Sequence, residues 1–228
     1  MTQEMIFKVT PSGLDYALKC KRCLWLSYKG IKLDAFFPPI FNSFDLIQKK
    51  FLITQSVKLM SKALPDGRIM NELNGFIGSS ILKDNKGRSF VINGKTDIVV
   101  EFKTNPKKYG IIDLKTTKIS PSKTENYKLQ LESYATIFEN PNSKTPKFSD
   151  IEELGLYLFE PKEITEISKD SCSMRFETLY LKGNRCHEDL IRRVTDIIDI
   201  CLMEKSPDYN LTCASCKFVV SLKKEKYI

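Results

Sequence analysis

Two aspartates and a lysine stand at the ends of apolar runs in the middle of the sequence. Asp97 lies in "INGKTDIVVEF", and Asp113 and Lys115 lie in "GIIDLKTTK", with one predicted turn between the two segments. Adjacent strands joined by a turn can bring the two carboxylates together at one end of a sheet. Oxygen ligands of this kind, completed by water, are those that Mg²⁺ and Mn²⁺ prefer. The pattern therefore predicts a divalent-cation site at Asp97 and Asp113.

Lys115 is placed to share that site. Side chains alternate along a strand, so Asp113 and Lys115 face one side and Leu114 faces the other. A divalent cation polarises a scissile phosphate and acidifies water, while the ammonium orients or deprotonates the nucleophile and offsets charge on the phosphate. Thr116 and Thr117 can add hydroxyl contacts. The chemistry predicted from these residues is phosphodiester hydrolysis.

Four cysteines form two C-x-x-C pairs near opposite ends of the sequence. The pairs are Cys20 with Cys23 and Cys213 with Cys216. The short spacing lets each pair chelate one centre, and two pairs together make a four-thiolate site. Zinc and an iron–sulfur cluster both accept four thiolates, so the ligands alone leave both open. A centre shared by both pairs would join the two terminal segments.

The charge balance favours a polyanionic partner. The sequence has 36 Lys+Arg against 28 Asp+Glu, a formal net charge of +8, which makes nucleic acid the first candidate. The alternative is a solvated, lysine-rich surface. The sequence has neither a secretory signal pattern nor an uninterrupted apolar run of about eighteen residues. We therefore expect a cytoplasmic protein with no membrane partner, whose cysteines stay reduced.

The elements that must position these residues are predicted from periodicity. Apolar residues recur at helical spacing in four segments, so helices are expected over 12–29, 43–64, 124–139 and 186–204. β-rich segments bounded by turn residues predict strands within 75–84, 89–102, 109–117, 154–161 and 173–181. No linker divides the sequence. The order indicates a single α/β domain over 1–228, with helices on both sides of the sheet.

Three motifs in succession carry a family resemblance. "GKTD", "IIDLKTTK" and "LQLESYA" resemble the motifs of the PD-(D/E)XK nuclease superfamily, in the RecB-like branch of AddB-type nucleases and CRISPR-adaptation exonucleases. The resemblance implies a restriction-endonuclease-like mixed sheet flanked by helices. It also implies that Asp97, Asp113 and the backbone carbonyl of Leu114 bind the metal, and that Lys115 is catalytic.

The third motif lies on the predicted helix that follows the strands. The resemblance assigns the family's Q-x-x-x-Y motif to Gln130 and Tyr134, which lie one helical turn apart and share a face. It places that face against the metal site and the bound strand. The alternative is that Tyr134 packs in the core and Gln130 faces solvent.

The first departure from the family pattern is a missing histidine. RecB-like enzymes usually carry a metal-binding histidine on a helix ahead of the strands, but the only histidine here, His187, lies far downstream. By position Asp45 takes its place, and a carboxylate there can bind Mg²⁺ or Mn²⁺. The replacement would alter metal preference or mark an inactive relative. Glu72, also ahead of the strands, is either a further acidic contributor or a solvated side chain.

The second departure concerns the cysteines. Several RecB-like nucleases close their ends with a four-cysteine [4Fe-4S] cluster, which the resemblance favours here. Their usual split is one cysteine near the N-terminus and three near the C-terminus. The two-plus-two split of this sequence keeps structural Zn²⁺ as the alternative.

The motifs together predict a metal-dependent DNA nuclease. The resemblance implies an exonuclease acting on single-stranded DNA ends, with a helicase or a CRISPR-adaptation protein as candidate partner. The alternative from another class is a catalytically silent nuclease-fold subunit that binds DNA or assembles with a partner. A third interpretation is a structural zinc protein with no nucleic-acid role. Metal-dependent cleavage separates the first two, and salt-dependent DNA binding separates both from the third.

Overall fold

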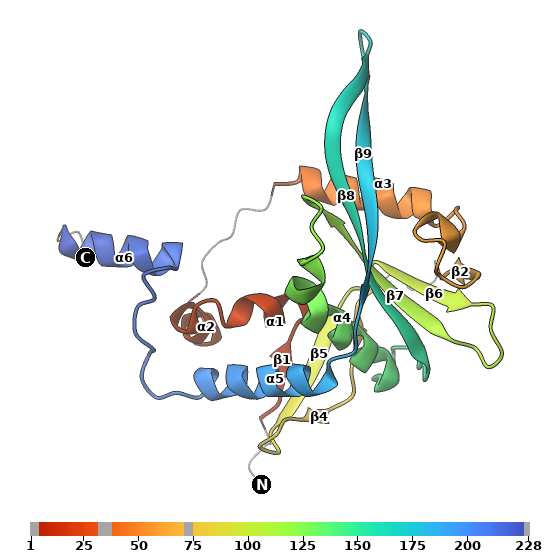
Figure 1. Cartoon of the computed structure of the whole chain (residues 1–228). Helices are drawn as coiled ribbons and strands as arrows, with labels where there is room; N and C mark the ends of the chain where they lie inside the picture. The colour runs from red at the N-terminus through yellow and green to blue at the C-terminus, as the bar shows by residue number, and fades with distance from the viewer. Residues whose placement is uncertain (1–4, 32–37, 71–74, 226–228) are drawn as a thin grey trace.

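The computed structural model describes residues 5–31, 38–70 and 75–225 (Figure 1). The chain folds as a mixed α/β protein with flanking helices, as predicted, but its strands form two sheets and not one. Among the helices of the described ranges, none combines the length and the hydropathy that crossing a bilayer requires. The helices are α1 (Pro11–Ala17), α2 (Lys21–Tyr28), α3 (Ile40–Leu52), α4 (Lys123–Glu139), α5 (His187–Cys201) and α6 (Ala214–Lys224).

The larger sheet has five strands and carries the predicted acidic motifs. Its β7 and β8 run parallel, and the other neighbouring pairs are antiparallel. Its order is β2 (Gly67–Ile69), β6 (Ile98–Phe102), β7 (Tyr109–Thr116), β8 (Ile151–Ile167) and β9 (Cys172–Gly183). The smaller sheet consists of β1 (Phe7–Val9), β3 (Ile77–Gly78), β4 (Leu82–Lys83) and β5 (Ser89–Gly94), and β5 pairs with each of the other three.

Both faces of the five-stranded sheet are buried because side chains alternate along its strands. Ile111 and Leu156 belong to a core that also contains residues of α4 and α5. Ile112 belongs to a second core, which Leu52 of α3 and the 3-10 helix η1 (Val57–Leu59) help to form. Helical segments therefore cover both sides of this sheet, as predicted.

The central helix α4 contacts strands of both sheets (Figure 1). Its Glu132 is completely buried, and the guanidinium of Arg185 donates to it through two bonds of 3.0 Å. The backbone N–H of Cys186 adds a third bond at 2.9 Å. Removal of Arg185 would leave the buried carboxylate of Glu132 without this partner, which is destabilising. These bonds fix the rotation of α4, and with it the directions of Gln130 and Tyr134.

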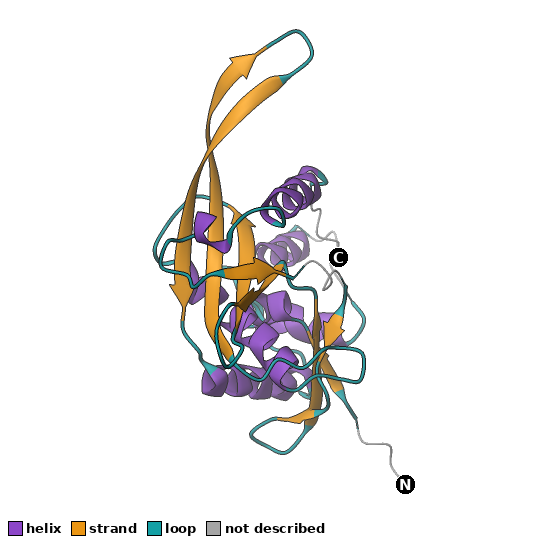
Figure 2. Cartoon of the chain, turned by 90° about the vertical axis from the view of Figure 1, so that its right-hand side faces the viewer, coloured by secondary structure: helices purple, strands orange, loops and turns teal. Residues whose placement is uncertain are grey.

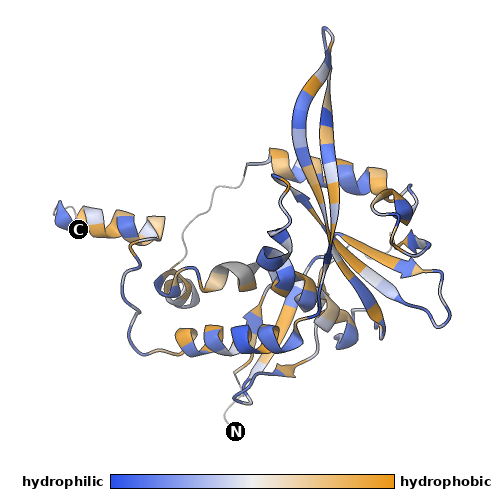
Figure 3. Ribbon diagram, viewed as in Figure 1, coloured by the Kyte–Doolittle hydropathy of each residue, from blue (hydrophilic) through white to orange (hydrophobic). Residues whose placement is uncertain are grey.

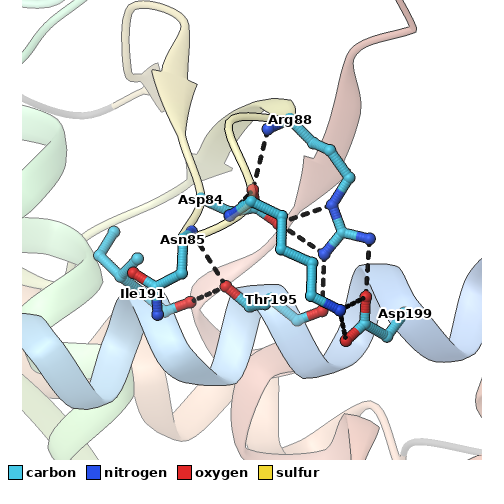
Figure 4. A network of polar contacts seen from close by, with 7 residues as sticks. Asp84, Asn85, Arg88, Ile191, Thr195 and Asp199 are labelled. Carbon is cyan, nitrogen blue, oxygen red and sulfur yellow. Dashed lines mark hydrogen bonds and ion pairs between the residues drawn. The ribbon is translucent and has the colours of Figure 1, made fainter.

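A polar network fixes α5 to the turn between β4 and β5 (Figure 4). The Arg88 guanidinium donates to Asp84 and to Asp199 of α5, both at 2.8 Å. Thr195 Oγ1 accepts a bond from the backbone N–H of Asn85 at 3.2 Å. Burial works to raise the pKa of Asp84, but the hydrogen bonds from Arg88 outweigh it and the pKa is lowered. The network holds the smaller sheet against α5.

The first predicted helix is interrupted in the structure. The pattern over 12–29 predicted one helix, but α1 ends at Ala17 and α2 begins at Lys21. Cys20 caps α2, because its backbone is extended and its Sγ accepts a bond from the backbone N–H of Cys23 at 3.5 Å. An extended capping residue starts a new helix rather than continuing an old one.

The second predicted helix, over 43–64, is wrong beyond Leu52. Ser56 has an extended backbone and caps η1 through a side-chain bond of 3.3 Å to a backbone N–H. Met60 and Leu64 are nevertheless buried in the same core as Leu52. Their helical spacing therefore reflected a shared core and not a continuous helix.

The predicted strand over 89–102 is two strands in different sheets. β5 ends at Gly94 and β6 begins at Ile98, so Asp97 lies in the connection directly before β6 and not on a strand. A Cβ at position 94 would lie 2.8 Å from the ring of Pro11. Glycine is the residue that permits this close approach. The chain leaves the smaller sheet at this point.

β8 and β9 form a long hairpin that projects from the sheet (Figures 1 and 2). The predicted strand over 154–161 covers the inner part of β8, whose pairing continues to Ile167, and the predicted strand over 173–181 covers nearly all of β9. The outer side chains are mostly exposed, and hydrophilic and apolar residues mix along them (Figure 3). The ladder of backbone hydrogen bonds, and not burial, defines this extension.

Candidate active site and cysteine centre

The pairing of β6 with β7 brings the two predicted aspartates together. Ile98 pairs with Ile112 in the antiparallel register, which places Asp97 beside the residues that follow Ile112. The backbone N–H of Leu114 donates to Asp97 Oδ2 at 2.8 Å. Asp113 directly precedes that residue, so the two carboxylates meet where β6 begins.

The backbone of Leu114 also faces this meeting point. The N–H and C=O of one strand residue point to the same edge of the strand. Because the N–H of Leu114 bonds to Asp97, its carbonyl oxygen points to the same side. Its side chain packs in the second core and is 6% exposed. Asp97, Asp113 and this carbonyl thus supply three oxygen donors at one edge.

Lys115 lies on the same face of β7 as Asp113, as strand alternation predicted. The two side chains form an ion pair, and Lys115 Nζ lies 4.9 Å from the centre of the Tyr127 ring. Burial lowers the pKa of Lys115, but the negative charge of Asp113 outweighs it and the pKa is raised. The side chain therefore carries its positive charge.

Asp113 is almost completely buried. It is 2% exposed, and this burial raises its pKa to about 7. The positive charge of Lys115 acts to lower the pKa, and the negative charge of Asp97 acts to raise it further. Two carboxylates held together away from solvent favour a bound cation. The donor set, two carboxylates and a carbonyl, fits a divalent cation such as Mg²⁺ or Mn²⁺.

Gln130 and Tyr134 of α4 contact Asp113 and the connection that carries Asp97. Gln130 Nε2 lies 3.2 Å from Asp113 Oδ1 and 3.3 Å from the Tyr134 hydroxyl. The Tyr134 hydroxyl donates to the carbonyl of Lys95 at 2.8 Å, in the connection that carries Asp97. Gln130 is 6% and Tyr134 is 5% exposed, so Gln130 does not face solvent. Tyr134 is both a core residue and a neighbour of the site.

Asp45 is linked to Asp97 through Lys49, a residue that was not predicted from the sequence. Lys49 Nζ lies 2.8 Å from Asp45 Oδ2 and 2.7 Å from Asp97 Oδ1. In the part of the chain that the structure describes, no three carboxylates come within ligating distance of one another. Lys49 follows Asp45 by one helical turn, and that spacing is the signal that could have identified it. Glu72 lies outside the described residues.

These side chains surround a cavity of about 580 Å³, called here the central cavity. Asp113 is buried beside the cavity and is not one of its lining residues. Gln48 closes one side by donating to Thr116 Oγ1 at 2.8 Å. The lining includes Phe41, Asp45, Lys49, Lys95, Asp97, Leu114, Lys115, Tyr127 and Gln130.

The four predicted cysteines converge in a second site, called here the cysteine centre. Cys20 Sγ lies 3.5 Å from Cys216 Sγ, and Cys23 Sγ lies 3.6 Å from Cys213 Sγ. All four sulfur atoms lie within 4.8 Å of one another, so they can hold a metal. Backbone N–H groups at the start of α6, first that of Cys216, lower the pKa of Cys213 to about 7.

The cysteine centre joins the terminal segments, as predicted. α2 carries Cys23 and α6 carries Cys216, and the two helices contact each other. Trp25 Nε1 donates to the Met203 carbonyl at 2.9 Å, and Arg22 donates to the Pro207 carbonyl at 2.8 Å. These bonds tie the segment that leads to α6 onto α2.

The fold and the central site together define a class of protein. A mixed sheet that brings together an aspartate directly before β6 with an aspartate and a lysine on β7, supported by a Gln-x-x-x-Tyr helix, is the arrangement of a PD-(D/E)XK nuclease. Residues 51–220 match the family model of the PD-(D/E)XK nuclease superfamily, and the chain belongs to this superfamily. Membership implies a nuclease that uses a divalent metal and binds DNA. The matched range contains Asp97, Asp113, Lys115 and Gln130.

A solved structure shares the fold. The chain is similar to the crystal structure of SSO0001, with a TM-score of 0.52 and 16% sequence identity, over 96% of this chain and 86% of that chain. At this identity the likeness concerns the fold alone. No curated protein matches the chain.

Proposed function

We propose that this protein is a Mg²⁺- or Mn²⁺-dependent deoxyribonuclease of the RecB-like branch, acting as an exonuclease on single-stranded DNA ends. The observation that carries the proposal is the joint arrangement of Asp97 and Lys115, which line one cavity, with the buried Asp113 beside them. In this proposal residues 1–228 act as one domain, whose ends are held together by the cysteine centre.

The proposed division of roles follows from the contacts. Asp97, Asp113 and the carbonyl of Leu114 would hold the cation, which supplies Lewis acidity to the scissile phosphate and to water. Lys115, held between Asp113 and the Tyr127 ring, directs its ammonium group at the phosphate and offsets the charge that develops there. Gln130 and Tyr134 act as positioning residues, because they contact Asp113 and the connection carrying Asp97.

The lining of the central cavity supports a single-stranded substrate. Phe41 and Tyr127 contribute aromatic rings to a wall that also contains Lys95 and Lys115. Unpaired bases stack on aromatic rings while cations contact the backbone, and a base pair hides the faces that would stack. An unpaired end therefore suits this cavity better than a duplex.

We propose zinc as the metal of the cysteine centre, in preference to the [4Fe-4S] cluster that the resemblance favours. Four sulfur atoms bound to one zinc at about 2.3 Å lie about 3.8 Å apart. The paired sulfur atoms lie 3.5 Å and 3.6 Å apart. In a [4Fe-4S] cluster each thiolate binds a different iron, which needs a wider spacing. Metal analysis and the visible spectrum of anaerobically purified protein distinguish the two.

Cleavage of end-labelled DNA by the full chain tests the proposal. Single- and double-stranded substrates are incubated with Mg²⁺, Mn²⁺ or EDTA, with Asp113→Ala in parallel. Cleavage is expected with either metal, faster on single strands, and absent with EDTA or in the variant. Cleavage that survives EDTA or the substitution would remove the proposed site from the reaction.

A second candidate function is a silent subunit that binds DNA or assembles with a helicase or a CRISPR-adaptation partner. The position of Asp45 favours it, because this residue replaces the family histidine and its carboxylate pairs with Lys49. Folded protein that binds single-stranded DNA in a salt-dependent manner but cleaves nothing under any metal would select this function over the first.

A further inference from the structure

A second cavity, of about 430 Å³, adjoins the central cavity and is called here the basic cavity. Tyr127 belongs to the lining of both. Lys19, Lys123 and Arg193 contribute to the basic cavity from three separate parts of the chain. The two cavities therefore adjoin at the ring over which Lys115 lies.

Two cations of the basic cavity keep their charge available to a ligand. Lys123 Nζ donates to Thr117 Oγ1 at 3.0 Å, and Arg193 donates to the carbonyl of Leu14 at 3.0 Å. Both acceptors are neutral oxygen atoms, which orient the cations without cancelling their charge. An anionic ligand would therefore meet two oriented positive groups.

Lys128, which also lines the basic cavity, differs from these two cations. Its ammonium group lies 3.2 Å from Glu125 and 3.1 Å from Asp189. Two carboxylates thus offset its charge. Lys128 completes the wall, whereas Lys123 and Arg193 give the basic cavity its preference for an anion.

The cysteine centre fixes the wall that Lys19 belongs to. Lys19 directly precedes Cys20, whose Sγ lies 3.5 Å from Cys216 Sγ. The carbonyl of Lys19 accepts a bond from Asn210 Nδ2 at 3.0 Å. Its backbone is therefore held by the segment that leads to α6. The metal at the cysteine centre would thus stabilise one side of the basic cavity.

We propose that the basic cavity binds the phosphate backbone of a nucleic-acid strand that continues from the central cavity past Tyr127. This inference rests on the proposed function, since it assigns a path to the same substrate. A phosphodiester chain carries its charges at regular intervals, and it can place neighbouring phosphates in the two adjoining cavities. The base between them would meet the Tyr127 ring.

The salt dependence of binding tests this proposal. The affinity of the full chain for a labelled single-stranded oligonucleotide is measured by fluorescence anisotropy in EDTA, so that binding is separated from cleavage. Each phosphate contact contributes about 0.7 to the slope of log affinity against log salt for a single strand. The double variant Lys123→Gln, Arg193→Gln should reduce the slope by about 1.4 and weaken binding about tenfold at low salt.

A matched control separates this effect from a change in net charge. Lys144 and Lys147 are exposed and lie outside both cavity linings. The double variant Lys144→Gln, Lys147→Gln removes the same charge and should leave the slope nearly unchanged. The double variant Lys123→Arg, Arg193→Lys retains both positive charges and should keep the wild-type slope. This variant serves as the folded comparison if the glutamine variant is unstable.

The outcomes distinguish this inference from the proposed function. An equal loss of slope in both glutamine variants, or a wild-type slope in the Lys123 and Arg193 variant, would overturn the inference even if the protein cleaves DNA. A selective loss of slope supports the basic cavity as a backbone site even if no cleavage is found.

Discussion

The central site and the cysteine centre are assembled in different ways. Asp113 and Lys115 lie on β7 and Asp97 lies directly before β6, and hydrogen bonds from Leu114 and Gln130 hold the aspartates. The cysteine centre combines segments from opposite ends of the chain, and its sulfur atoms contact mainly one another. The difference teaches that neighbouring parts of one sheet prepare the central site, whereas the cysteine centre requires two distant segments to be held together, by hydrogen bonds such as that of Trp25 to Met203 and by the metal that the sulfur atoms would bind.

The largest expected effect is on catalysis at the central site. Lys115→Ala should lower the rate of DNA cleavage at least about a thousandfold, because it removes the ammonium group that would offset the negative charge developing on the phosphate. DNA affinity should change little, since other cations remain in both cavities. Single-turnover cleavage and anisotropy on the same samples check this, with the exposed neighbour Lys118→Ala as control. Cleavage at the rate of the control would remove Lys115 from its proposed role.

Loss of the cysteine centre should destabilise the protein but leave Mn²⁺ binding at the central site nearly unchanged. The double substitution Cys23→Ser, Cys213→Ser removes two ligands and should lower the free energy of unfolding by more than about 3 kcal/mol. Below its unfolding temperature the variant should still bind Mn²⁺ at the central site. Denaturant unfolding and Mn²⁺ titration measure the two quantities. Equal loss of both would mean that the central site depends on the cysteine centre.

A support residue of the central site should have an intermediate effect. Gln130→Leu keeps the bulk of the side chain but removes the bond to Asp113, and we expect cleavage or Mn²⁺ affinity to fall about 10–100-fold. KM for DNA should stay constant, because Gln130 positions the carboxylate. A variant with raised KM and unchanged kcat would instead indicate that Gln130 contacts the substrate.

The smallest effect is expected from Lys49, the internal cation of the central site. Lys49→Gln removes an ammonium group that lies 2.7 Å from Asp97 Oδ1. A charged hydrogen bond contributes about 1.5–3 kcal/mol, so Mn²⁺ affinity should rise on the order of tenfold once this competitor is removed. Isothermal titration calorimetry measures the change, and Lys50→Gln on the same helix is the control. Weaker Mn²⁺ binding in Lys49→Gln would show that the lysine supports the site.

The local parts of the central site could be predicted from the sequence. Strand alternation predicted that Asp113 and Lys115 share one face of β7, and helical spacing predicted that Gln130 and Tyr134 share one face of α4. Both periods act over a few residues, and so they are visible in the sequence. The convergence of the cysteines was also predictable, because two C-x-x-C pairs suffice for a four-thiolate site.

The parts that could not be predicted depend on tertiary contacts. Asp97 was expected on a strand, but β5 ends at Gly94, where the backbone lies close to Pro11, and β6 begins only at Ile98. The spacing of Lys49 from Asp45 indicates that these two residues pair, but the contact of Lys49 with Asp97 requires α3 to lie against β7, which no spacing in the sequence reports. The strands β1 and β2 are too short to show a period. The outer part of β8, beyond Pro161, has no buried face whose pattern could be read.

The most direct test of the central claim measures Mn²⁺ binding and DNA cleavage together in the wild-type chain and in Asp113→Asn. The asparagine keeps the shape of the side chain while removing the charge that a cation would meet. We predict that the wild-type chain binds Mn²⁺ at the central site and cleaves single-stranded DNA, and that the variant loses both. Wild-type Mn²⁺ affinity or undiminished cleavage in Asp113→Asn would contradict the claim that Asp97 and Asp113 form the metal site of a nuclease.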